Sequence, residues 1–250
     1  MYLFFVREDD IYVLYALGPL IMVALVYMFQ PQINYWWLGK NPVQLDKPIL
    51  DMLNNTNPVY NSLSQEERAG FDKEIYLQTE GNAYVAKGME KDHEVPYDVK
   101  FMLTQIPVTI ERQLKNKKLK RFERVVVYKH AFPSPKHRFL HSAETDVEDG
   151  VVIISTEQAQ NAFFNPQSHY NNAWHAYAEA FVKLYPNKDY PSVGNDIWET
   201  IQNISGFDQN HIKAVLGFDS IDPIPVLITL FFNNSENFKD TDLDLSLIHI

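Results

Sequence analysis

The longest uninterrupted apolar stretch of the chain lies close to its start. Residues Ile11–Phe29 contain no charged side chain over 19 positions. As a helix rising about 1.5 Å per residue, the stretch would extend about 28 Å, which is close to the hydrocarbon thickness of a bilayer. Tyrosine and tryptophan residues gather toward its two ends, which is typical of side chains at a membrane surface. We therefore predict one membrane-spanning helix within residues 1–30, in contact with lipid.

Two other interpretations of this stretch are a cleaved signal peptide and a buried helix of a soluble core. The acidic segment Arg7–Asp10 in front of it argues against a signal peptide, and so does the lack of a small-residue cleavage site behind it. Arg7 is the one basic residue before the stretch, whereas Lys40 and Lys47 follow it. Because basic residues favour the cytoplasmic side, we expect the rest of the chain to be cytoplasmic.

After this stretch, the pattern predicts a linker over residues 31–60 and a globular domain over residues 61–250. The linker is rich in proline and asparagine and contains one short helix at Pro48–Leu53. Ser64 and Glu67 have the spacing of a capping box, so a helix should begin there and run to about Gln78. Further helices are expected where apolar residues recur every three to four positions: Asp98–Leu114, Thr156–Phe164, Ala173–Tyr185, Ile197–Ile204, Asn210–Val215 and Asp222–Asn233.

Two runs of β-branched residues predict strands at Arg124–Tyr128 and Gly150–Ser155. The second run is apolar at consecutive positions, which is typical of a strand buried on both faces. Helices, two strands and further helices follow one another in this order, so the sequence predicts an α+β fold.

Composition narrows the chemistry of the globular region. The chain carries a net charge of −10, which argues against nucleic acid as a partner because phosphate binding requires a basic surface. It contains no cysteine, which excludes disulfides, thiolate zinc sites and cysteine nucleophiles.

The helix predicted at Ala173–Tyr185 carries the pattern of a zinc peptidase in altered form. In such a helix, histidines at positions i and i+4 bind Zn²⁺ and a glutamate at i+1 activates the metal-bound water. Here His175 stands at the first position, Ala176 at the position of the base and Glu179 at that of the second histidine. Four residues separate His175 from Glu179, so both lie on one face of a helix.

Several segments of the chain resemble, in the same order, those of the MtfA family of zinc-dependent peptidases. The catalytic core of that family is similar to that of anthrax lethal factor. The resemblance implies a zincin-like domain and places Asp222 where the family has its third zinc ligand. It covers about two thirds of the chain and rests on Phe71–Gln78, Phe122–Phe132, Val151–Ser155, Asn172–Glu179 and Leu230–Lys239.

The altered site leads to three interpretations of His175, Glu179 and Asp222. We expect His175 and Glu179 to be a buried, hydrogen-bonded pair left over from an ancestral site, with Asp222 nearby and no cofactor, because a carboxylate in place of one imidazole and the loss of the base remove much of the order around such a site. One imidazole and two carboxylates are also able to bind zinc, manganese or iron, so a non-catalytic metal site is the second interpretation. An active zinc site with divergent ligands is the third.

The functional hypothesis follows from the anchor and the altered site together. We expect a membrane-anchored, catalytically inactive metallopeptidase-like protein that serves as a structural or partner-binding subunit of a membrane assembly. The alternatives are an active membrane-anchored zinc-dependent peptidase and a cytoplasmic regulator-binding module.

The remaining histidines show no tight ligand spacing. His137 and His141 are four residues apart, but they lie in a segment that follows Pro133 and Pro135. We therefore expect both to be solvated side chains of a loop.

Overall fold

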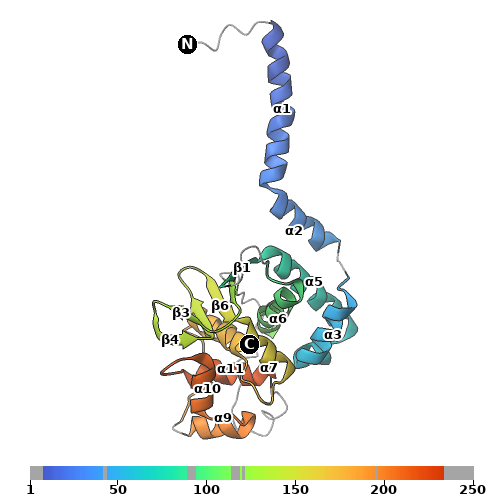
Figure 1. Ribbon diagram of the computed structural model, residues 1–250. Coiled ribbons are helices and arrows are strands. Elements are labelled where there is room, and N and C mark those ends of the chain that lie inside the picture. Colours follow the sequence, from blue (N-terminus) through green and yellow to red (C-terminus); the bar gives the residue numbers. More distant parts are fainter. Residues whose placement is uncertain are drawn as a thin grey trace. The chain divides into compact units, whose positions relative to one another are not determined.

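The chain forms two compact units, Met1–Val43 and Gln44–Ile250, and each is described by itself. The computed structural model (Figure 1) describes residues 8–41, 44–88, 94–113, 119, 122–194 and 196–233. Leu114, at the end of a predicted helix, lies outside the described residues, and so do residues 234–250.

The first unit contains two helices, α1 (Glu8–Met28) and α2 (Gln30–Lys40). Helix α1 covers most of the predicted span Ile11–Phe29, and its side chains are described from Leu17 onward. Large apolar side chains on both helices are exposed; Val23, for example, is 68% exposed. Among the described residues, no single helix is long and apolar enough to cross a membrane. Two helical segments, Leu17–Met28 and Gln32–Lys40, are long and apolar enough when taken together, but a bend of 68° separates them.

The second unit begins earlier than the predicted boundary at residue 61. Two helices, α3 (Lys47–Thr56) and α4 (Pro58–Ser62), bring the buried side chains Ile49, Leu53 and Tyr60 into a core cluster. Proline is tolerated in the first turn of a helix, and Pro48 and Pro58 both occupy such positions. The short helix predicted at Pro48–Leu53 is confirmed as part of α3, Pro58 starts a second helix, and residues 44–60 belong to the globular unit.

Two longer helices complete this part of the core. Helix α5 (Gln65–Gly81) begins at Ser64 with both hydrogen bonds of the predicted capping box. Helix α6 (Tyr97–Gln113) is buried at nearly every position from Val99 to Glu111, as expected of a central helix that is covered on all sides.

The main sheet has four strands in the order β1-β2-β6-β5. β1, β2 and β6 are parallel, whereas β5 pairs antiparallel with β6 and forms one edge. A separate antiparallel pair, β3-β4, makes a short hairpin. The two predicted strands are confirmed as β2 and β6, and the other four were not predicted. The strands are β1 (Ala83–Lys87), β2 (Arg124–Tyr128), β3 (Phe132–Ser134), β4 (His137–His141), β5 (Ala143–Asp146) and β6 (Val151–Ser155).

The last five helices of the described chain lie where the apolar spacing predicts them, within one or two residues at their ends. Helix α8 packs against β5 and β6 on one side and against α11 on another. The fold is therefore α+β, as predicted, and α8 lies at its centre. These helices are α7 (Thr156–Phe164), α8 (Asn172–Leu184), α9 (Ile197–Ser205), α10 (Gln209–Leu216) and α11 (Pro223–Asn233).

Candidate functional site

Helix α8 is fixed at its N-terminus by two consecutive asparagines with different roles. The side-chain oxygen of Asn171 accepts hydrogen bonds from the backbone N–H groups of Ala173 and Trp174, both at 3.1 Å, and so caps the helix. The side-chain NH₂ of Asn172 donates to the carbonyl oxygens of Ser142, at 2.8 Å, and Ser155, at 3.1 Å. Asn172 thereby joins the start of α8 to the ends of β5 and β6.

Small side chains bring α8 close to its neighbours. Ala173, Ala176, Ala178 and Ala180 are fully buried. The carbonyl oxygen of Ala176 accepts a hydrogen bond of 3.0 Å from the hydroxyl of Thr145 on β5. The position that holds the base of a zinc peptidase is therefore a buried alanine within the contact between helix and sheet.

His175 is buried, with 3% of its surface exposed. Its Nδ1 forms a 2.8 Å hydrogen bond with the hydroxyl of Tyr170, which fixes the orientation of the ring. Burial lowers the pKa of His175 to about 4, although the negative charges of Glu179 and Asp222 act in the opposite direction. The imidazole is therefore neutral at physiological pH.

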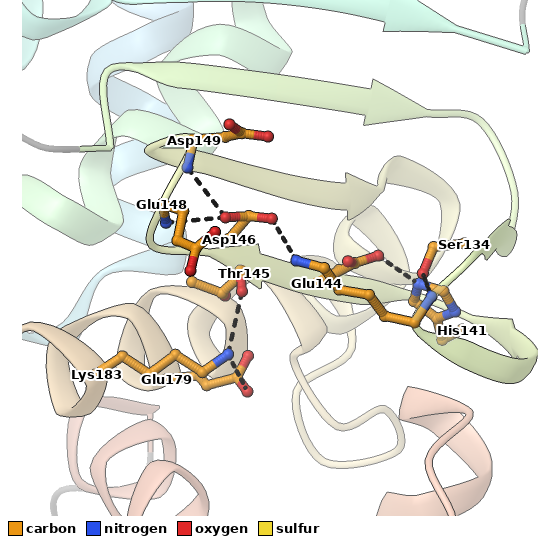
Figure 2. A network of polar contacts seen from close by, with 10 residues as sticks. Ser134, His141, Glu144, Thr145, Asp146, Glu148, Asp149, Glu179 and Lys183 are labelled. Carbon is orange, nitrogen blue, oxygen red and sulfur yellow. Dashed lines mark hydrogen bonds and ion pairs between the residues drawn. The ribbon is translucent and has the colours of Figure 1, made fainter.

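The structure places the three predicted site residues around one cavity, but not as the expected buried pair. His175 is buried, Glu179 is half-buried and Asp222 is exposed, and His175 and Glu179 each bond to another residue. His175, Glu179 and Asp222 line one cavity of about 140 Å³. Glu179 forms a 2.9 Å ion pair with Lys183, whose ammonium also donates to the carbonyl oxygen of Thr145 at 3.1 Å (Figure 2). Asp222 accepts a 2.9 Å hydrogen bond from the backbone N–H of Ile224 in the first turn of α11.

These residues do not fit the metal ion that the MtfA resemblance implies. Among the described residues, the one set of three potential ligands with all ligand atoms within 4.8 Å of one another is His137, His141 and Glu144. His175, Glu179 and Asp222 do not converge in this way. Glu179 is also already paired with Lys183 at 2.9 Å, so its carboxylate is engaged.

A second and larger cavity adjoins the first. It measures about 550 Å³ and shares Glu179, Lys183, Phe218 and Ser220 with the smaller one. Its other walls come from the β3-β4 hairpin, through His137, and from β5, through Glu144 and Thr145. Together the two cavities form a cleft between α8, β5 and the hairpin.

The prediction that His141 is solvated is wrong. His141 has no exposed surface and Glu144 is 6% exposed, and Nε2 of His141 lies 3.1 Å from Oε2 of Glu144 (Figure 2). His137 is exposed, as predicted, but it belongs to β4 and not to a loop. The spacing of the two histidines was visible in the sequence, but Glu144 joins them only because β4, the following bend and β5 fold back together.

The stability of the folded chain should depend on pH because His175 is buried. Its pKa is about 4 in the folded chain and about 6.5 when unfolded. Between these values the unfolded chain binds more protons, so the folded state loses stability as pH falls from about 6.5 to about 4. A pKa shift of this size corresponds to a loss of about 3 kcal/mol in the free energy of unfolding, which we assign to His175.

Urea unfolding of wild type and His175→Gln at about pH 7 and pH 4.5 measures this contribution. The variant should lose less stability on acidification. The exposed His169 provides a matched control, and His169→Gln should keep the wild-type pH dependence. An unchanged pH dependence in His175→Gln would contradict the assignment.

Comparison with known protein families and with curated proteins finds no match to this chain.

Proposed function

We propose that this chain is a membrane-attached protein whose zincin-like domain, similar to that of the MtfA family, binds a protein partner within a membrane assembly and does not hydrolyse peptides. One observation carries the proposal. The position of the catalytic base is the fully buried Ala176, and the polar groups beside it, His175 and Glu179, are each held by an internal partner.

Hydrolysis of a peptide by activated water needs a group that accepts a proton within hydrogen-bonding reach. Ala176 offers none. Glu179 is the nearest carboxylate on the same helix, but Lys183 neutralises its charge at 2.9 Å. Helix α8 therefore gives the cleft no proton acceptor that is free of an internal partner, which supports binding of a partner over hydrolysis of a peptide.

The cleft also offers a surface for an extended segment of a partner. β5 is the last strand at one edge of the main sheet, and no described strand pairs with its outer side. Extended peptides bind such edges by adding a strand, and side-chain pockets beside the edge provide specificity. The 550 Å³ cavity lies beside β5 and is lined by both acidic and basic residues, which suits a polar segment.

Attachment to the membrane is proposed from the first unit. The exposed apolar side chains of α1 and α2, and the combined length of the bent pair Leu17–Met28 and Gln32–Lys40, support insertion into lipid. The basic residues Lys40 and Lys47 support a cytoplasmic position for the second unit.

One preparation of the full-length chain tests the proposal. The chain should stay with the membrane fraction after alkaline extraction. After extraction in mild detergent, the mass of the protein–detergent particle should exceed the mass of one chain and one micelle. With Zn²⁺ added, it should not cleave a denatured protein substrate. A monomer in detergent, or cleavage that His175→Gln abolishes, would overturn the proposal.

A further inference from the structure

The strongest feature that the proposed function does not use is the cluster of His137, His141 and Glu144, which we call the hairpin cluster. One potential ligand atom from each residue lies within 4.8 Å of the others. The rings of His137 and His141, four positions apart on β4, are 4.7 Å apart between centroids. The pairing of β4 with β3 is irregular, with a shift in register between Phe132 and Ser134.

Each ring nitrogen of His141 faces an oxygen atom that only accepts hydrogen bonds. Nδ1 lies 3.2 Å from the carbonyl oxygen of Phe139, and Nε2 lies 3.1 Å from Oε2 of Glu144. A neutral imidazole has one N–H for these two oxygens. A metal ion between Nε2 and the carboxylate would leave that N–H for the carbonyl and satisfy both contacts.

The same arrangement is typical of histidines that bind metals. Such a histidine donates its other ring N–H to a carbonyl or carboxylate, which fixes the ring and increases the basicity of the ligating nitrogen. For His141, the carbonyl oxygen of Phe139 stands in this position. The His141 ring is packed between Phe132, at 4.4 Å, and Phe218, at 5.8 Å between ring centroids, so neighbouring side chains hold it in place.

The charges near the hairpin cluster allow a divalent cation. Three basic residues line the adjoining cavity, but Lys136 is paired with Asp146 and Lys183 with Glu179. Arg138 packs over the ring of Phe139. His137 and Glu144 both line the 550 Å³ cavity, which provides an entry path and space for a further ligand.

We propose that His137, His141 and Glu144 form a binding site for a divalent transition-metal ion of the zinc type. Two imidazoles and one carboxylate, with a fourth position open to solvent, form a common zinc ligand set, and the chain has no thiolates that would favour softer ions. A tetrahedral ion with bonds of about 2.0–2.2 Å needs ligand atoms about 3.4 Å apart. The 3.1 Å separation of His141 and Glu144 is close to this value, and rotation of the exposed His137 ring completes the set.

The site is distinct from the one implied by the MtfA resemblance. It lies on β4 and β5 and uses none of His175, Glu179 and Asp222. It also does not depend on the absence of peptidase activity.

Metal titration of the full-length chain in mild detergent, after removal of metals with EDTA, tests the site. Co²⁺ alone should bind at one equivalent per chain and give the visible absorption of a tetrahedral ion, and Zn²⁺ should displace it. His137→Ala should weaken binding at least tenfold. Because His137 is exposed, this variant should fold, and circular dichroism checks that it does.

Two further variants locate the ion. His169→Ala removes an exposed histidine outside both sites and should leave Co²⁺ affinity unchanged. His175→Gln should also leave it unchanged, because the proposed ligands do not include His175. Absence of stoichiometric binding in wild type would show that the three side chains do not hold a metal ion. Loss of Co²⁺ binding in His175→Gln but not in His137→Ala would show that the ion binds on α8 instead. Either result overturns the proposal.

Discussion

Asn172→Asp is expected to destabilise the folded chain by about 3–5 kcal/mol, as is typical of an uncompensated charge in a protein interior. The side chain of Asn172 is fully buried, and its NH₂ donates to two carbonyl oxygens, those of Ser142 and Ser155. An aspartate would place a carboxylate against both of these acceptors. The side-chain oxygen of Asn172 has no hydrogen-bond partner among the described residues, so a second oxygen would gain none there.

The neighbouring asparagine provides the control. Asn171 accepts two backbone N–H bonds at the N-terminus of α8, where a negative charge is favourable, so Asn171→Asp should change stability by no more than about 1 kcal/mol. Urea unfolding followed by tryptophan fluorescence compares the two variants. The loss in Asn172→Asp should shrink at acid pH, where the aspartate is protonated and donates one bond. Equal losses in both variants would show that Asn172 does not join α8 to the sheet as described.

Gly217→Ala is expected to lower the free energy of unfolding by about 3–5 kcal/mol, because it adds both left-handed backbone strain and overpacking. Gly217 ends α10 with φ of +81°. A Cβ atom at this position would lie 2.2 Å from the carbonyl oxygen of Leu140 and 2.6 Å from Cα of His141, so backbone would have to move. The contact is reinforced from the other side, because the N–H of Ser142 donates to the carbonyl oxygen of Leu216 at 2.9 Å.

Gly206 is the matched control, since it ends α9 with φ of +77° but has no neighbour within 4 Å of a Cβ. Gly206→Ala should therefore lower the free energy of unfolding only by the backbone strain, about 1–2 kcal/mol. Urea unfolding measures the difference between the two variants. If the hairpin cluster binds metal, Gly217→Ala should also weaken Co²⁺ binding, because it displaces His141, whereas Gly206→Ala should not. Similar losses of stability in both variants would contradict the close contact.

Elements with strong local signals were predicted well. The capping box at Ser64 and Glu67, the apolar spacing of α8 and the β-branched run of β6 lie within short segments of the chain. Each of these signals acts between residues that are close in sequence, so it survives without knowledge of the fold. Proximity of His175 and Glu179 follows from helix geometry alone for the same reason.

The linker shows how a local signal misleads. The prolines over residues 31–60 suggested a linker with one short helix at Pro48–Leu53. That helix is part of α3, whereas the helix that Pro58 starts, α4, was not predicted. Ile49 and Leu53 have helical spacing in the sequence, yet their burial depends on α5 and α6, which follow later in the chain. The boundary of the globular unit was therefore decided by packing between distant segments.

The sequence by itself determined the helices around the candidate site, the two central strands and the absence of a base at Ala176. The tertiary structure decided the strand Ala143–Asp146, the pairing of Lys183 with the carbonyl oxygen of Thr145 and the burial of His141 beside Glu144. The segment Ala143–Asp146 is polar and short, so it becomes a strand only by pairing with β6. Helical contacts join residues three or four positions apart, whereas strand pairing and burial join residues that only the folded chain brings together.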